Sequence, residues 1–213
     1  MLFVAFSDYE NVSDSANVYS GIIEGDDHGI WTAIIESTGY TKIIYYSIDH
    51  FTMDGIMGYL IDTKNNISTA TAINGTLINA RVHSSGDIYG SWSGIDSAHG
   101  SLYAMKQTAT AQYAGTYSGT FPGKDLLTWT MRIDNYGRTF GTRTNSTIKS
   151  SANFTGGVDD YGGGRVLGDG GIASFFISGN DVNGVLFDEH GYSIDSFTGT
   201  KQTTVKSTMH QSG

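Results

Sequence analysis

The second half of this sequence repeats the first. At a spacing of roughly 95 residues, matching residues recur in the same order, and the spacing between them drifts by only a few positions. The matches are Tyr19 with Tyr113, Trp31-Thr32 with Trp129-Thr130, Ile35 with Ile133, Gly75 with Gly170, Asp87-Ile88 with Asp181-Val182, and Lys106-Gln107-Thr108 with Lys201-Gln202-Thr203. Self-similarity at a fixed period indicates a duplicated structural unit. We therefore expect two related units, over residues 1–108 and 109–213.

Each unit consists of short segments in which apolar and polar residues alternate. In 129–134, for example, Trp129, Met131 and Ile133 fall on one face of an extended chain and polar residues fall on the other. Turns rich in Gly, Asn and Asp separate about eight such segments in each unit. Turns this short join neighbouring strands as antiparallel hairpins and leave no room for crossover helices.

Eight short strands can close into an up-and-down barrel, which removes exposed sheet edges. We therefore predict an all-β protein made of two tandem eight-stranded antiparallel up-and-down β-barrels. The alternative is a single larger β-sandwich or barrel formed by both repeats. An outer-membrane barrel is disfavoured, because the outward positions of the strands are mostly Thr, Ser, Arg and Asp rather than an apolar band.

Composition narrows the functional classes. The chain has 12 Lys and Arg against 21 Asp and Glu, a net charge of −9, which argues against nucleic acid as a partner. It has no Cys, which excludes disulfides, thiolate metal sites and a Cys nucleophile. The apolar stretch 1–6 is too short for a membrane span, and we interpret it as a first strand or the remnant of a trimmed leader. We expect a protein that does not span the membrane.

The second repeat resembles a group of small barrels from the bacterial envelope and secreted proteins. The similarity lies in the pattern Tyr-x-Gly-x-Tyr-x-Gly from Tyr113, in Trp129-Thr-Met-Arg-Ile-Asp, and in Phe197-Thr-Gly-Thr-Lys201. In rhythm it is similar to the eight-stranded barrels of transferrin-binding-protein-like surface lipoproteins, although no Cys is present for acylation. The resemblance covers nearly all of 111–202 and, more faintly, 17–107. It implies a binding module that is extracellular or in the bacterial cell envelope, and it carries over no active site.

Two acidic turns contain a histidine and are candidate sites for Ca²⁺ or another divalent cation. One holds Asp26, Asp27 and His28, and the other holds Asp188 and His190. Carboxylates beside an imidazole could bind such an ion if a neighbouring loop added ligands. The same residue types are favoured in tight turns, so solvated hairpin tips are the alternative. We predict no other cofactor.

Aromatic residues are more numerous than a small core requires. They could form a sugar-stacking platform or a protein interface, or they could fill the barrels and pair across strands. The candidate ligand-binding residues are Trp31, Tyr45, Tyr59, Trp92, Trp129 and Met131. The copies differ most in their middle segments, and 43–61 is Ile- and Tyr-rich only in the first copy.

These observations predict a non-enzymatic, extracytoplasmic binding or interaction protein, with a protein or small molecule as its ligand. We predict no catalytic residue, because no Gly-x-Ser-x-Gly motif is present and we interpret Asp49-His50 as residues that flank the start of a strand. A carrier that holds a small apolar ligand in one barrel is the alternative, and a hydrolase with a site assembled from distant strands is the third. Carriage predicts a cavity of some hundreds of Å³. Interaction predicts an aromatic patch on the outside or at the seam between the barrels.

Overall fold

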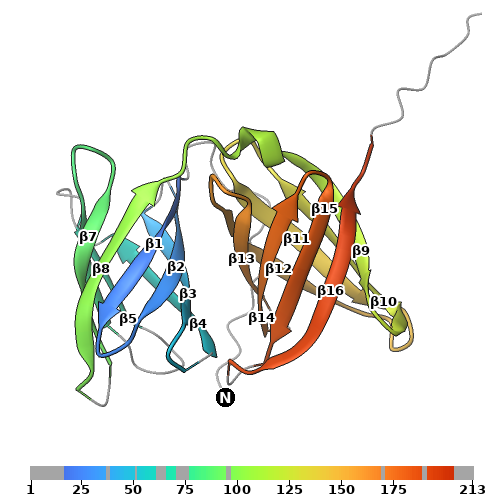
Figure 1. Cartoon of the computed structure of the whole chain (residues 1–213), viewed down its shortest axis with the longest axis horizontal. Helices are drawn as coiled ribbons and strands as arrows, with labels where there is room; N and C mark the ends of the chain where they lie inside the picture. The colour runs from blue at the N-terminus through green and yellow to red at the C-terminus, as the bar shows by residue number, and fades with distance from the viewer. Residues whose placement is uncertain are drawn as a thin grey trace, which may run out of the picture.

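The computed structural model describes residues 17–36, 39–50, 52–60, 66–70, 77–94, 97–168, 171–188 and 191–203, and it describes no side chains at 52, 54, 56–60, 66–70 and 125. Two curled sheets lie side by side, one from each half of the chain (Figure 1). A short 3₁₀ helix, Thr110–Tyr113, lies between the last strand of the first half and the first strand of the second.

Six strands of the first half form a strongly curled antiparallel sheet. In spatial order they are β6 (Leu77–Val82), β7 (Ile88–Ser93), β8 (His99–Lys106), β1 (Asn17–Gly25), β2 (Gly29–Ile35) and β3 (Tyr40–Ser47). The backbones of β4 (Thr52–Leu60) and β5 (Asn66–Ala70) pair with the two edges of this sheet and with each other. The backbone pairing therefore continues from β3 through β4 and β5 back to β6, the first strand in this order.

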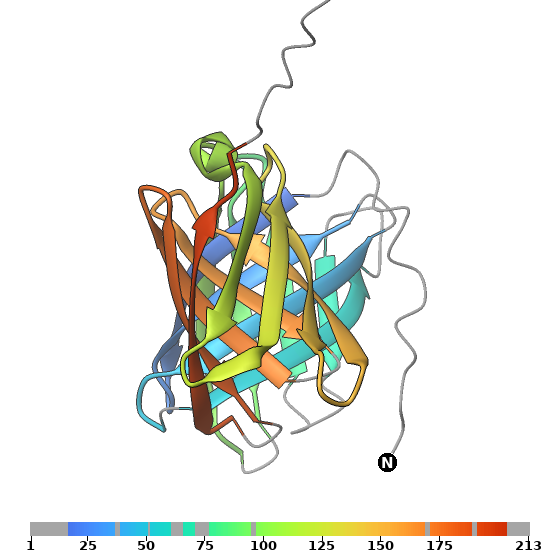
Figure 2. The same cartoon turned by 90° about the vertical axis from the view of Figure 1, so that its right-hand side faces the viewer.

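The second half forms a closed barrel of eight antiparallel strands. Its strands are β9 (Gly115–Phe121), β10 (Lys124–Ile133), β11 (Arg138–Asn145), β12 (Ser150–Val158), β13 (Gly163–Gly168), β14 (Gly171–Ser178), β15 (Asp181–Phe187) and β16 (Ser193–Lys201). Each strand pairs with the next in sequence, and β16 closes the barrel on β9. Figure 2 looks onto this half, with the tilted strands wrapping round the barrel.

The all-β prediction is therefore confirmed, and so is a closed eight-stranded up-and-down barrel in the second half. Among the described strands, ladder pairing stays within each half, so the alternative of a single sheet running through both halves is not what forms. In the first half, most side chains of β4 and all those of β5 lie outside the described residues.

The duplicated tryptophans occupy equivalent places in the two halves. Trp31 on β2 lies opposite Gly21 on β1, and Trp129 on β10 lies opposite Gly119 on β9. A Cβ at either glycine would lie 1.8 Å from a carbonyl oxygen of the neighbouring strand. Because that contact is impossible, both positions require glycine, and β1 and β9 approach the neighbouring strand closely there.

Consecutive apolar residues place the two halves against each other. Ile35 and Ile43 belong to the core inside the first sheet, whereas their chain neighbours Ile34 and Ile44 are buried on its outer side. Ile44 belongs to a cluster with Met53 from its own half and with Ile172 and Phe187 from the second half, so the outer faces here are not the polar surface that the alternation predicts.

A buried arginine also joins the halves. Arg165 on β13 donates from Nη1 to Thr32 Oγ1 on β2, over 2.7 Å. Burial lowers the pKa of the Arg165 guanidinium to about 10, so the group is still charged at neutral pH. Close by, a Cβ at Gly157 would lie 2.7 Å from Val18 Cγ1, so β12 and β1 approach too closely for a larger residue.

The connection between the halves is anchored by Asp160. Its carboxylate accepts hydrogen bonds from the backbone N–H groups of Thr108 and Ala109, and its own N–H donates to Gln107 Oε1. The turn between β12 and β13 is thereby attached to the segment that follows β8.

Candidate functional site

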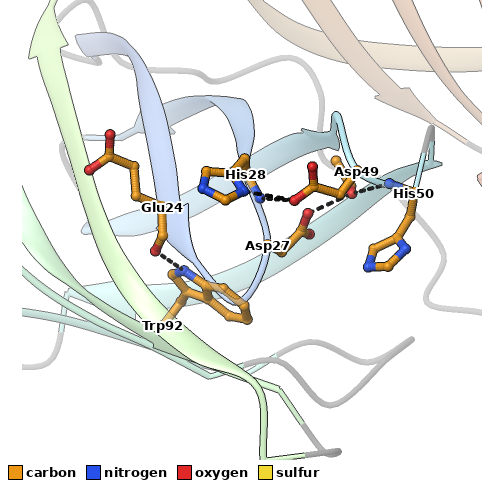
Figure 3. Close-up of polar contacts among 7 residues, drawn as sticks. Glu24, Asp27, His28, Asp49, His50 and Trp92 are labelled. Carbon is orange, nitrogen blue, oxygen red and sulfur yellow. Dashed lines mark hydrogen bonds and ion pairs between the residues drawn. The ribbon is translucent and has the colours of Figure 1, made fainter.

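The turns at one end of the first sheet bring several polar side chains together (Figure 3). The turn between β1 and β2 carries Asp27 and His28, and the turn after β3 carries Asp49 and His50. His28 donates from its backbone N to Asp49 Oδ2 over 2.9 Å, and its Nδ1 lies 2.8 Å from the same oxygen. Ser47 Oγ donates to Asp27 Oδ1 over 2.7 Å and accepts from the His50 N–H over 3.0 Å.

The same turn is also attached to β8. The His99 backbone N–H donates to Asp26 Oδ2 over 3.0 Å, and the Asp26 N–H donates to the His99 carbonyl over 3.1 Å. His99 Nδ1 lies 3.2 Å from the same carboxylate oxygen. These contacts fix the turn between two neighbouring hairpins, so its acidic residues hold defined positions at this end of the sheet.

The close contact of His28 with Asp49 changes the titration of both groups. The hydrogen bond that His28 donates to Asp49 raises the pKa of His28, and the attraction of the same carboxylate adds to the effect. The hydrogen bond from His28 lowers the pKa of Asp49. The pair is exposed to solvent.

The hydroxyl of Ser47 donates its hydrogen bond to Asp27 and not to an imidazole. These turns therefore do not form the serine–histidine pair that activates a nucleophilic serine.

The structure distributes the predicted metal ligands over different partners. Asp26 bonds His99, Asp27 bonds Ser47, and His28 bonds Asp49. Asp188 accepts a hydrogen bond from the Tyr192 N–H and shapes the turn before β16, and His190 lies outside the described residues. Within the part of the chain that the structure describes, no group of three or more His, Asp or Glu is placed to hold a metal ion.

Three of the predicted ligand-binding aromatics lie inside the first sheet. Trp31 is buried, and its Nε1 donates to the carbonyls of Ile22 and Tyr103 over 3.1 and 3.0 Å. Trp92 Nε1 donates to the Glu24 carbonyl over 3.2 Å, and Tyr45 packs against the same core. A space of about 20 Å³ remains between them, room for one or two water molecules. The side chain of Tyr59 lies outside the described residues.

Trp129 and Met131 face the interior of the second barrel. They line a cavity of about 50 Å³ among phenylalanine, leucine and valine side chains. Trp129 is 4% exposed, and its Nε1 has no hydrogen-bond partner among the described residues. The two interiors, alike in the sequence pattern, therefore differ in packing and in hydrogen bonding.

A groove with a volume of about 520 Å³ runs along the seam between the two halves, and the sequence did not identify the residues that line it. The first half contributes Ile30 and Tyr46, and the second half contributes Gly163, Ser174, Phe175, Phe176, Asn183, Gly184, Val185 and Phe187. The sequence signal for it is a doublet of apolar residues within a strand, because one member must face outward. Tyr45-Tyr46 and Phe175-Phe176 are such doublets, and their outward members, Tyr46 and Phe176, line the groove.

Comparison with known proteins adds no family: no protein-family model and no curated protein matches the chain. Of the residues described, no helix has the length and apolar character needed to cross a membrane.

Proposed function

We propose that the chain is a non-enzymatic binding protein built from two eight-stranded barrels, and that the seam groove receives an apolar segment of a partner protein. The observation that carries the proposal is an apolar row across the outer face of the first half. Ile22 pairs with Ile30 across β1 and β2, and Ile30 pairs with Tyr46 across β2 and β3. This row leads into the groove, where the ring centroids of Tyr46 and Phe187 lie 6.1 Å apart.

The opposite wall supports the same interpretation. Phe176 is on the outer face of β14, paired with Asn183, and it is 53% exposed. Large exposed aromatic side chains in a groove between polar borders are typical of protein interaction sites, and aromatic residues often dominate the binding energy.

The charge around the groove indicates what kind of segment fits it. Ile30 follows the β1–β2 turn by two residues, and Tyr46 precedes Asp49 by three, so the turns that carry Asp27 and Asp49 lie beside the row, at the end of the sheet nearer to it. With a net charge of −9, the chain attracts basic partners and repels acidic ones. The partner segment we propose is apolar, with Lys or Arg beside the apolar residues.

We place this binding outside the cytoplasm, on the cell surface, in the envelope or in the medium. The support for the location is the resemblance of the repeat to envelope and secreted barrels. Fractionation of the source cells with an antibody to the chain tests it, and recovery only in the cytoplasmic fraction contradicts it.

Selection from a random peptide library tests the binding function. The full chain is the target, and the Phe176→Asp variant removes peptides that bind elsewhere. We expect the retained peptides to combine two or three apolar residues with neighbouring Lys or Arg, and to bind Phe176→Asp at least tenfold more weakly. The matched control is Leu126→Asp, because Leu126 is 56% exposed on β10 and does not line the groove.

Two outcomes contradict the proposal. In the first, every selected peptide binds the parent chain and the Phe176→Asp variant with the same affinity. In the second, the peptides that prefer the parent chain are acidic. Sedimentation of the free chain tests a third outcome, in which the groove binds a second copy of the chain. In that case the parent chain forms a dimer and the Phe176→Asp variant does not.

A further inference from the structure

The exposed aliphatic side chains of the second half gather at one end of its barrel. Alternate turns of an up-and-down barrel lie at the same end, so the β9–β10, β11–β12 and β15–β16 turns share one end (Figure 2). Leu126, Ile148 and Ile194 lie in or beside these turns and are 56%, 70% and 53% exposed. At the opposite end the large exposed side chains are instead Tyr136 and Tyr161. One end of the barrel therefore presents aliphatic side chains to solvent.

The turn between β11 and β12 holds Ile148 at its tip. The backbone N–H groups of Thr147 and Ile148 donate to Asn145 Oδ1 over 3.0 and 3.4 Å. The Ser146 N–H donates to the Leu126 carbonyl over 2.9 Å, which attaches this turn to the beginning of β10. Ile148 and Leu126 are therefore presented by adjoining backbone segments that hydrogen bonds hold in place.

The β11–β12 hairpin carries positive charge and no negative charge. Residues 135–158 contain no Asp or Glu, although the chain has 21 of them. Lys149 follows Ile148 at the tip and is exposed, and Arg143 is half-buried near the end of β11. Neither cation has an ion-pair partner among the described residues. The hairpin is thus a positively charged segment of an acidic chain.

The acidic residues at this end of the barrel lie on other strands and turns. Asp125 is on β10, and Asp195 on β16 forms an ion pair with Lys124. Asp188, before β16, accepts a hydrogen bond from the Tyr192 N–H. An anionic surface is therefore approached most favourably by the β11–β12 tip, because like charges repel it towards β16.

We propose that this end of the second barrel binds the surface of a membrane that contains anionic lipids. Ile148 and Leu126 enter the boundary between headgroups and acyl chains, and Lys149 contacts lipid phosphates. Apolar side chains beside a cation bind such a surface by burying apolar area and by attraction to anionic lipids. A protruding tip offers a rigid protein partner little contact area, whereas a fluid lipid surface adapts to it. This surface shares no residue with the seam groove.

Flotation of the full chain with lipid vesicles tests the proposal. The probes are vesicles of phosphatidylcholine and phosphatidylglycerol in equal parts, compared with vesicles of phosphatidylcholine alone. We expect the chain to float with the mixed vesicles, and to do so less at high salt, because salt screens the attraction.

A fluorescent label shows which part of the chain enters the membrane. The chain has no Cys, so Thr147→Cys accepts a single environment-sensitive label beside Ile148, and Tyr161→Cys accepts one at the opposite end. On addition of mixed vesicles we expect the emission of the first label to shift to the blue and that of the second to stay unchanged.

Variants separate the apolar contribution from the electrostatic one. Ile148→Ser should weaken binding about tenfold, because the area of one aliphatic side chain no longer leaves water. Its control is Tyr161→Ser at the opposite end, which should bind as the parent chain does. Lys149→Gln should weaken binding to the mixed vesicles severalfold. Arg132→Gln, the same charge change on the outer face of β10, should have a smaller effect.

Four outcomes overturn the proposal. The chain binds neither kind of vesicle, or it binds both equally well. Ile148→Ser and Tyr161→Ser weaken binding to the same extent. Dextran sulfate displaces the vesicles while Ile148→Ser leaves binding unchanged, which would assign the tip to a soluble polyanion instead.

Discussion

Arg165 shows how one residue joins two duplicated units. Its side chain is buried between them, and its bond to Thr32 is a contact between strands from different halves. Its Nε has no partner among the described residues. A buried charge with incomplete hydrogen bonding is costly to fold, whereas removing one partner of such a group is costlier still.

We predict that substitutions of Thr32 and of Arg165 change the free energy of unfolding differently. Thr32→Val leaves a further guanidinium N–H unsatisfied and should lower the free energy of unfolding by about 1–3 kcal/mol. Arg165→Met removes the buried charge with its unpaired group and should be neutral or stabilising. Urea unfolding measures both, with Arg132→Met as the exposed control, expected within about 0.5 kcal/mol of the parent chain. A larger loss for Arg165→Met than for Thr32→Val contradicts this account.

The pair of His28 and Asp49 predicts a pH dependence. The carboxylate raises the pKa of His28 in the folded chain above its ordinary value of 6.5. The stabilisation is therefore fully present below pH 6.5 and is lost as the pH rises through the raised pKa. Asp49→Asn should return the His28 pKa towards 6.5, measured by NMR titration of the imidazole. Asp195→Asn, the same charge change beside Lys124 in the second barrel, should leave it unchanged. A His28 pKa at or below 6.5 in the parent chain contradicts the pairing.

At the scale of the strand, alternation predicted most of the fold. It identified the inward residues of β10, and the short turns ruled out crossover connections. Alternation could not predict which outer face packs against the other half. An outward apolar residue gives the same sequence pattern whether solvent or a neighbouring sheet covers it. Ile44 and Ile22 illustrate this, since both face outward but only Ile44 is buried, at 0% exposure against 43%.

These two isoleucines give a matched test. Ile44→Ala removes side-chain atoms from the cluster between the halves and should cost about 2–5 kcal/mol of unfolding free energy. Ile22→Ala removes the same atoms from a half-exposed position, so its cost should stay below about 1 kcal/mol. Denaturant unfolding of the two variants compares them. Equal losses would show that the outer face of β3 is not packed against the second half.

At the scale of the whole molecule, the duplication predicted two similar units but not their contact or their different interiors. Both depend on residues distant in sequence: Ile44 meets Phe187, and Gly199 leaves room for the Trp129 ring, since a Cβ there would lie 2.3 Å from Cζ2 of Trp129. The same limit applies to the sites. The sequence identified Trp129 and Met131 as inward candidates, but an unsatisfied N–H is visible only once the neighbours of the ring are known.

The shared apolar cluster predicts that both halves unfold together. Calorimetry of the parent chain should show one transition, because separating the halves exposes Ile44, Ile172 and Phe187 to water. Gly157→Leu should separate the transition into two, because a Cβ at this position already meets Val18. Leu126→Ala, at an exposed site on β10, should retain one transition. Two transitions in the parent chain would mean that the halves are energetically independent.

The central functional claim is that the seam groove is where a partner binds. Its most direct test replaces Phe176 with a photo-cross-linking amino acid in the full chain within the source cells, with the same replacement at Leu126 as the control. The account predicts a cross-linked protein at position 176 and not at 126, joined through an apolar segment with adjacent Lys or Arg and lost when Ile30→Asp is added. Cross-linking to the same protein from both positions, or capture at 176 that Ile30→Asp leaves unchanged, would contradict it.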